Sequence, residues 1–162
     1  MVQKVIFFII EFKRTLSDFT SEYKKYNKGE EGFKEAKDLL ASLDESKYHY
    51  IIGGEYKEGG EGLTLKIKRY FNVDCVTELN PDEIFEGGMT VNELNQYTKW
   101  FTEFKNHNHS SDDSDGSGSA GSGGLSHSFV LAVDENKKTT IIPVNYYVKF
   151  SLRNKKAFKP GG

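Results

Sequence analysis

The chain has 162 residues, of which 36% are hydrophobic and 28% charged, and its formal net charge is −2. This length is typical of one domain, and the apolar content is sufficient for a hydrophobic core. The single cysteine, Cys75, excludes an internal disulfide framework and a metal site built from paired cysteines. We therefore expect an intracellular protein, cytoplasmic or nuclear, in a reducing environment.

The N-terminal segment opens with an apolar run from Val5 to Ile10, which is too short for a signal peptide or a membrane span. We therefore predict no membrane association. The β-branched and Phe residues of this run are typical of a buried central strand, and a helix from about Thr15 to Asn27 is expected to follow. An alternative remains open, because apolar residues over 4–27 also recur at the spacing of a heptad seam in one long helix.

Next in the chain, the sequence predicts a short helix and a long hairpin. Apolar residues at helical spacing from Phe33 to Leu43 indicate a second helix that ends near Ser46. Two strands, Tyr48 to Ile52 and Leu63 to Phe71, follow and are joined by a glycine-rich loop. Glycines permit the turn conformations that a hairpin requires.

A helix is expected to begin after Thr90. Its hydroxyl can cap the helix, Glu93 three residues later can return the hydrogen bond, and Met89 with Leu94 fits a hydrophobic staple. Aromatic residues continue at helical spacing to Phe104. Such a stripe is typical of a face that packs on a sheet.

A Gly/Ser-rich tract from Ser114 to Gly124 divides the chain, and we predict a flexible linker over 106–126. Three origins remain open: a natural low-complexity loop, a shortened loop, or a join between two chains. The residues after it, 127–162, contain two strand-like runs beginning at Phe129 and Ile141. An isolated two-stranded hairpin is marginally stable in water, so we expect this tail to complete a sheet that starts before the linker.

The predicted order of elements gives an α+β fold. It matches βαββαβ, the ferredoxin-like arrangement, with helices on one face of an antiparallel sheet and an extra C-terminal strand. All of 1–162 is expected to form a single domain around the linker.

Charge is unevenly distributed along the chain. From Asn136 onward there are seven basic residues and no acid, a charge of +7, so the preceding 135 residues carry −9 to give the total of −2. If the polar positions of the strands Leu63–Phe71 and Val144–Arg153 share the open face of the sheet, that face is basic and aromatic. The residues concerned are Lys66, Lys68, Tyr70, Tyr147, Lys149 and Arg153.

Basic groups interleaved with aromatic rings fit single-stranded nucleic acid, because cations meet phosphates and rings stack on bases. The first hypothesis is therefore a non-enzymatic binding module for single-stranded nucleic acid or another acidic partner. The alternative is a protein-assembly subunit that pairs with another chain through the Phe-rich N-terminus or a sheet edge. A homo-oligomer is one form of this alternative.

A small enzyme is the third hypothesis, and the sequence offers it little support. Two of the four histidines, His107 and His109, lie in the predicted linker, where ligand geometry is not fixed. Cys75 has no basic neighbour in sequence that would lower the pKa of its thiol. We therefore predict no catalytic residue, no cofactor and no metal site.

Overall fold

The computed structural model describes residues 4–16, 19–73, 79–105 and 128–157, with side chains up to residue 150. Cys75, His107, His109 and the predicted linker 106–126 lie outside the described residues. The strands are β1 (Ile6–Thr15), β2 (His49–Tyr56), β3 (Leu63–Arg69), β4 (Ser128–Val133) and β5 (Thr139–Pro143). The helices are α1 (Thr20–Tyr23), α2 (Gly29–Leu40), α3 (Val91–Glu103) and α4 (Val144–Ala157), with short 3-10 helices η2 (Asp44–Tyr48) and η3 (Tyr70–Asn72).

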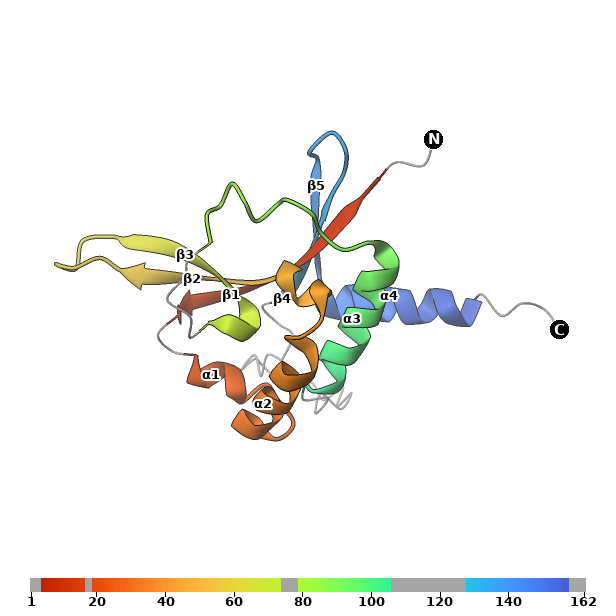
Figure 1. Ribbon diagram of the computed structural model, residues 1–162, viewed down its shortest axis with the longest axis horizontal. Coiled ribbons are helices and arrows are strands. Elements are labelled where there is room, and N and C mark those ends of the chain that lie inside the picture. The colour runs from red at the N-terminus through yellow and green to blue at the C-terminus, as the bar shows by residue number, and fades with distance from the viewer. Residues whose placement is uncertain (1–3, 17–18, 74–78, 106–127, 158–162) are drawn as a thin grey trace, which may run out of the picture.

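The five strands form one mixed sheet in the order β3-β2-β1-β4-β5 (Figure 1). β1 and β2 are parallel, and the other neighbouring pairs are antiparallel. The α+β class is confirmed. The sheet is not the antiparallel ferredoxin-like one, because the chain returns through α1 and α2 to place β2 directly beside β1, with no strand between them.

The N-terminal apolar run forms a central strand, as predicted, and the long heptad helix over 4–27 is wrong. Ile9 and Ile10 of β1 are both buried although they point to opposite faces, so the strand is covered on both sides. The expected helix over 15–27 is present only as the single turn α1.

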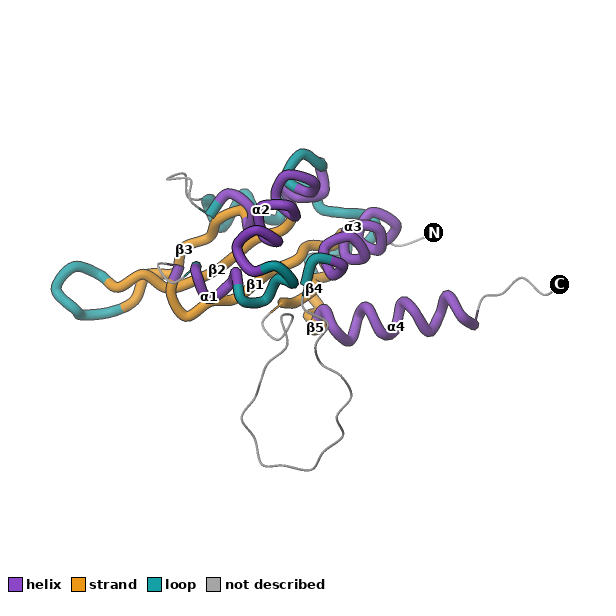
Figure 2. Tube along the Cα trace, turned by 90° about the horizontal axis from the view of Figure 1, so that it is seen from below, coloured by secondary structure: helices purple, strands orange, loops and turns teal. Residues whose placement is uncertain are grey.

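Helices α1, α2 and α3 cover one face of the sheet, which we call the inner face (Figure 2). Their amphipathic pattern explains this placement, because Phe33 of α2 and Leu94 of α3 bury their side chains against Ile51 of β2 in one core. The capping box at the start of α3 is confirmed: the Thr90 hydroxyl accepts a hydrogen bond from the Glu93 backbone N–H at 3.2 Å.

The segment after the predicted linker supplies two strands to this sheet. β4 pairs with β1, where Val130 lies opposite Ile9, and β5 then forms the sheet edge. Val130 is almost fully buried. The body of the chain and its C-terminal segment therefore share one core.

The last predicted strand, which was expected to begin at Ile141, is a strand only as far as Pro143, because Val144–Ala157 forms helix α4. Val144 is fully buried, and Tyr147 and Val148 pack against the inner core, so the side chains at helical spacing are those that gain burial. Pro143 ends β5 immediately before this helix. In the part of the chain that is described, no helix is long and apolar enough to cross a membrane.

The opposite face of the sheet, the outer face, is covered only in part. Residues 79–88 run over it, where Ile84 packs with Phe8 and Tyr50 in a second, smaller cluster. The Tyr50 hydroxyl donates a hydrogen bond to the Ile84 carbonyl oxygen at 3.0 Å, which holds this segment on the sheet.

Candidate functional site

The basic side chains predicted for an open sheet face lie on the inner side instead. Lys66 and Lys68 of β3 are half-buried and share the face that carries the helices. The Lys66 ammonium pairs with Glu55 at 2.9 Å, and the Lys68 ammonium donates a hydrogen bond to the Val73 carbonyl oxygen at 2.9 Å. The side chains of β3 therefore alternate as predicted, but the lysines lie on the helix-covered face and the leucines on the open face, the reverse of the prediction.

The two predicted aromatic residues and the two remaining basic residues are also in other places. Tyr70 follows β3 in the turn η3 and is fully buried, while Tyr147 is half-buried on α4 and its hydroxyl donates a hydrogen bond to Asn95. Lys149 is exposed on α4, and the backbone of Arg153 belongs to the same helix. The structure thus does not bring the six predicted residues together.

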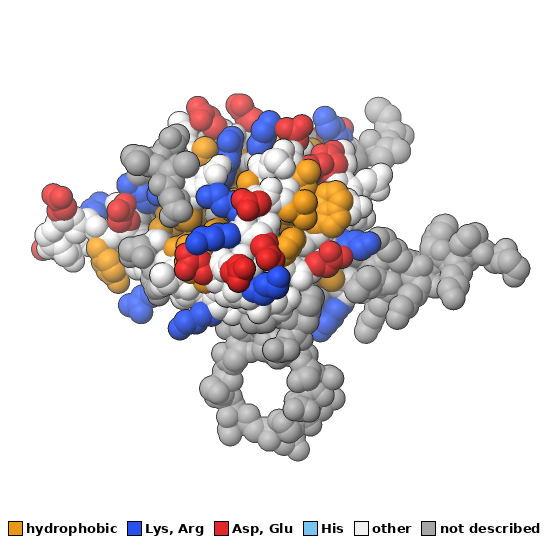
Figure 3. All heavy atoms as spheres, turned by 60° about the horizontal axis from the view of Figure 1, so that its bottom comes forward, with side chains coloured by type: hydrophobic (Ala, Val, Ile, Leu, Met, Phe, Trp, Pro, Cys, Tyr) orange, Lys and Arg blue, Asp and Glu red, His pale blue; other side chains and the backbone are white. Residues whose placement is uncertain are grey.

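The helix-covered side of the molecule carries both signs of charge intermixed (Figure 3). Surface pairs such as Lys28 with Glu35 and Lys34 with Glu30 contribute to this pattern. A surface of mixed sign does not provide the continuous positive field that binding through phosphates requires.

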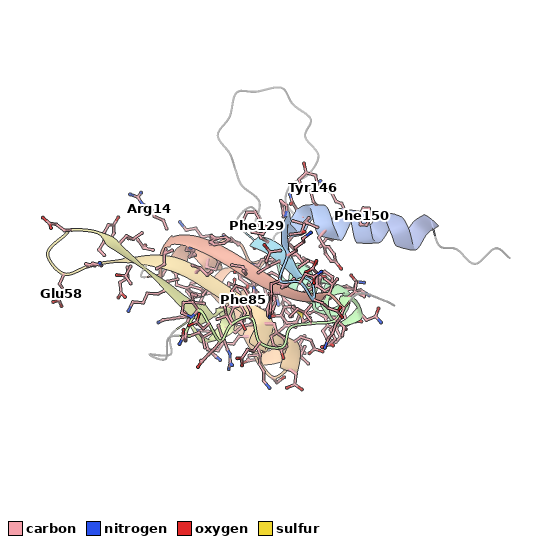
Figure 4. All side chains as sticks on the ribbon, turned by 90° about the horizontal axis from the view of Figure 1, so that it is seen from above. Arg14, Glu58, Phe85, Phe129, Tyr146 and Phe150 are labelled. Atoms are coloured by element: carbon pink, nitrogen blue, oxygen red, sulfur yellow. The ribbon has the colours of Figure 1, made fainter. Side chains whose placement is uncertain are left out.

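The outer face presents a row of apolar side chains that begins at the part covered by residues 79–88, where Ile52 and Ile67 pack against the smaller cluster. In register, Phe12 lies opposite Ile52, and Ile52 lies opposite Ile67. Phe129 of β4 extends the row, since its ring meets that of Phe12 edge to face at a centroid distance of 5.6 Å. The row therefore crosses four adjacent strands, β3, β2, β1 and β4. Its end on β4, Phe129, is labelled in Figure 4.

Large side chains in this row and beside it are open to solvent. Leu65 is 68% exposed, Leu63 48% and Phe12 41%. We call the whole set the outer apolar patch, and its members are Phe12, Ile52, Tyr56, Leu63, Leu65, Ile67 and Phe129. Contiguous exposed apolar surface of this kind is uncommon on monomeric proteins and marks interaction sites.

A second feature, which the sequence did not indicate, is a buried polar cluster between the inner face and the helices. Its centre is Lys105, just beyond α3, whose ammonium lies 3.4 Å from the Glu22 carboxylate and 3.8 Å from that of Glu11. The same ammonium donates a hydrogen bond to the Tyr70 hydroxyl at 3.1 Å and lies 4.2 Å from the centre of the Tyr26 ring. All five side chains are almost fully buried.

The cluster continues along β1 and β2 through Glu11. Oε1 of Glu11 accepts a hydrogen bond from the Ser128 hydroxyl at 2.7 Å, and Oε2 of Glu11 lies 3.8 Å from Nε2 of His49. The other ring nitrogen of His49 is hydrogen-bonded to the Tyr97 hydroxyl at 2.8 Å. Oε2 of Glu11 and Nε2 of His49 have no hydrogen-bond partner among the described residues.

Burial and neighbouring charges set the ionisation of this cluster. Burial opposes ionisation of Glu11, but the Lys105 ammonium and His49 outweigh it and hold the pKa of the carboxyl well below its usual range. Burial lowers the pKa of His49 and of Lys105, although the adjacent carboxylates oppose the shift. Burial also raises the pKa of Tyr97 well above its ordinary value.

Perturbed titrating groups often mark active sites, but they also occur in structural ion-pair networks. A depression of about 120 Å³ is lined by residues such as Leu43, Lys47 and Arg69, and it includes no member of the cluster. The residues that contact Glu11 or Lys105 come instead from different elements of the fold. Glu22 belongs to α1, Lys105 follows the end of α3, and Ser128 begins β4. The geometry therefore supports a structural network that fastens these elements to β1.

Comparison with known proteins gives no further assignment. The chain matches no protein-family model, and no curated protein or solved structure is significantly similar to it.

Proposed function

We propose that the chain is a non-enzymatic assembly module that joins two copies through the outer faces of their sheets. The observation that supports the proposal best is the outer apolar patch, whose exposed Leu65 and Leu63 occupy positions that the strand pattern assigns to a core. Burying such a side chain is favourable by about 1.5–3 kcal/mol. A second protein surface offers that burial.

A second copy of the chain is a suitable partner for two reasons. Sheets in folded domains are commonly covered by a layer on each face, and stacking two outer faces provides the layer that residues 79–88 leave incomplete. Among the charged residues of β1, only Arg14 is exposed, and it lies next to the row. In a dimer, the exposed Glu58 of the other copy's β2–β3 hairpin provides a carboxylate for this arginine (Figure 4). Interfaces of this type are isologous, with the same patch on both partners.

Sedimentation velocity over a range of protein concentrations tests this proposal. We expect reversible dimer formation, weakened about tenfold or more by Leu65→Lys, because about 1.4 kcal/mol of lost interface energy corresponds to a factor of ten. Thr64→Lys is the matched control, since Thr64 is the exposed neighbour whose side chain points to the inner side. A monomer at every concentration, or equal effects of the two variants, would contradict the proposal.

A further inference from the structure

Helix α4 projects from the rest of the molecule, as two perpendicular views show (Figures 1 and 2). Its first turn is anchored, since Val144 is fully buried and Val148 packs against the inner core. Tyr147 adds a hydrogen bond from its hydroxyl to Asn95 of α3. The helix is therefore held in one direction at its N-terminal end.

The side of this helix that does not pack carries aromatic and basic side chains. Tyr146 is 68% exposed and Phe150 is 64% exposed (Figure 4). Lys149, which precedes Phe150 in the sequence, is also exposed. Residues three and four positions apart lie on the same side of a helix, so these three side chains form one stripe. Arg153 continues the helix at the next position of this spacing.

The charge of α4 indicates the sign of a ligand. Within Val144–Ala157 the four charged residues, Lys149, Arg153, Lys155 and Lys156, are all basic. Acidic residues such as Glu22 and Glu35 form ion pairs with lysines elsewhere in the fold. The helix thus presents an excess of positive charge to an anionic partner.

We propose that α4 binds single-stranded nucleic acid, with bases stacked on Tyr146 and Phe150 and a phosphate paired with Lys149. The exposed rings favour this ligand over an acidic peptide or a duplex. Acidic peptides and duplex phosphates engage the cations alone, whereas the unpaired bases of a single strand also cover the rings. The proposal is independent of the outer apolar patch, which lies on β1–β4.

The test is fluorescence-anisotropy titration of the full chain with a labelled 15-nucleotide oligo-dT at 50 and 200 mM salt. The phosphate contact of Lys149 alone predicts a loss of affinity of about 2.6-fold over this range, from a slope of about −0.7 per contact. Phe150→Ala is expected to weaken binding by about 5- to 150-fold, which corresponds to loss of one stacked base. Because Phe150 is exposed, the fold is expected to survive, and circular dichroism confirms it.

Tyr56→Ala is the matched control, since Tyr56 is a 61% exposed aromatic residue on the β2–β3 hairpin and not on α4. It is expected to leave the affinity for oligo-dT unchanged. Polyglutamate and a 15-base-pair duplex serve as competitors, and both are expected to compete poorly. Absence of binding at 50 mM salt, equal effects of the two Ala variants, or efficient competition by polyglutamate or duplex would overturn the proposal.

Discussion

Replacing Lys105 by Met tests whether the buried polar cluster is a structural network. The substitution keeps an unbranched apolar side chain but removes the charge that lies 3.4 Å from Glu22 and 3.8 Å from Glu11. It also removes the hydrogen bond to the Tyr70 hydroxyl. Breaking a buried ion pair by removal of one partner costs about 3–5 kcal/mol. Here the cost falls on Glu11, whose buried carboxylate loses its lysine, whereas Glu22 keeps the Lys25 ammonium at 2.9 Å.

Urea unfolding followed by circular dichroism measures this loss. We expect the unfolding midpoint of Lys105→Met to fall with an unchanged denaturant slope, which indicates lower stability without a change in the surface exposed. Lys99→Met is the control, since Lys99 is exposed on α3, and substitutions at such positions usually change stability by about 0.5 kcal/mol or less. Adding Glu11→Gln to Lys105→Met should recover part of the loss. If Lys105→Met costs no more than the control, the cluster does not stabilise the fold.

Three further predictions concern the same framework. Folding lowers the pKa of His49 from 6.5, so the unfolded chain binds the proton more readily than the folded one. Stability should therefore fall as the pH drops below about 6.5. Chemical unfolding from pH 8 to 5 should show this slope, and His49→Gln should flatten it. Gly54→Ala should lower stability by about 1–3 kcal/mol through overpacking, since a Cβ there lies 2.6 Å from Leu63 Cδ2 and 2.8 Å from the Arg14 carbonyl oxygen; a thermal midpoint equal to that of the unchanged protein would contradict it. Deleting 114–124 halves the 22-residue connection from Lys105 to Ser128 and should raise stability by about 0.6 kcal/mol, because loop closure costs less; a large loss in urea unfolding would show that the tract makes stabilising contacts.

Local signals in the sequence predicted several elements well. The continuous apolar run gave β1, and the Thr90–Glu93 pair gave the start of α3, because each depends on residues close together in the chain. The hairpin of β2 and β3 follows its turn glycines in the same way. Of the two strands expected after the predicted linker, the first is β4. The second was expected to continue past Val144, but the strand β5 ends at Pro143 and Val144 begins a helix.

The error at Val144 has a physical reason. The run from Val144 to Leu152 alternates as a strand would, but Val144, Tyr147 and Val148 also have the spacing of a helical face. Short apolar runs that satisfy both periods are decided by what they pack against. Here α3 and the inner core provide that surface, so the helix forms.

The position of the candidate sites could not be predicted for a related reason. Alternation along β3 separates Lys66 and Lys68 from Leu65, but it does not say which side the helices cover. The buried cluster unites residues as distant in sequence as Glu11 and Ser128, and no local pattern connects them. The outer apolar patch was missed because its leucines were assigned to the core.

The outer apolar patch is the central element of the functional account, and side-chain methyl NMR tests it most directly. Spectra of methyl-labelled protein recorded on dilution report on Leu63, Leu65 and Ile67 on the outer face, with Leu94 and Val130 of the inner core as internal references. We predict concentration-dependent shifts for the outer methyl groups and none for the references. Outer methyl shifts that stay constant at all concentrations would contradict pairing of two copies through this face.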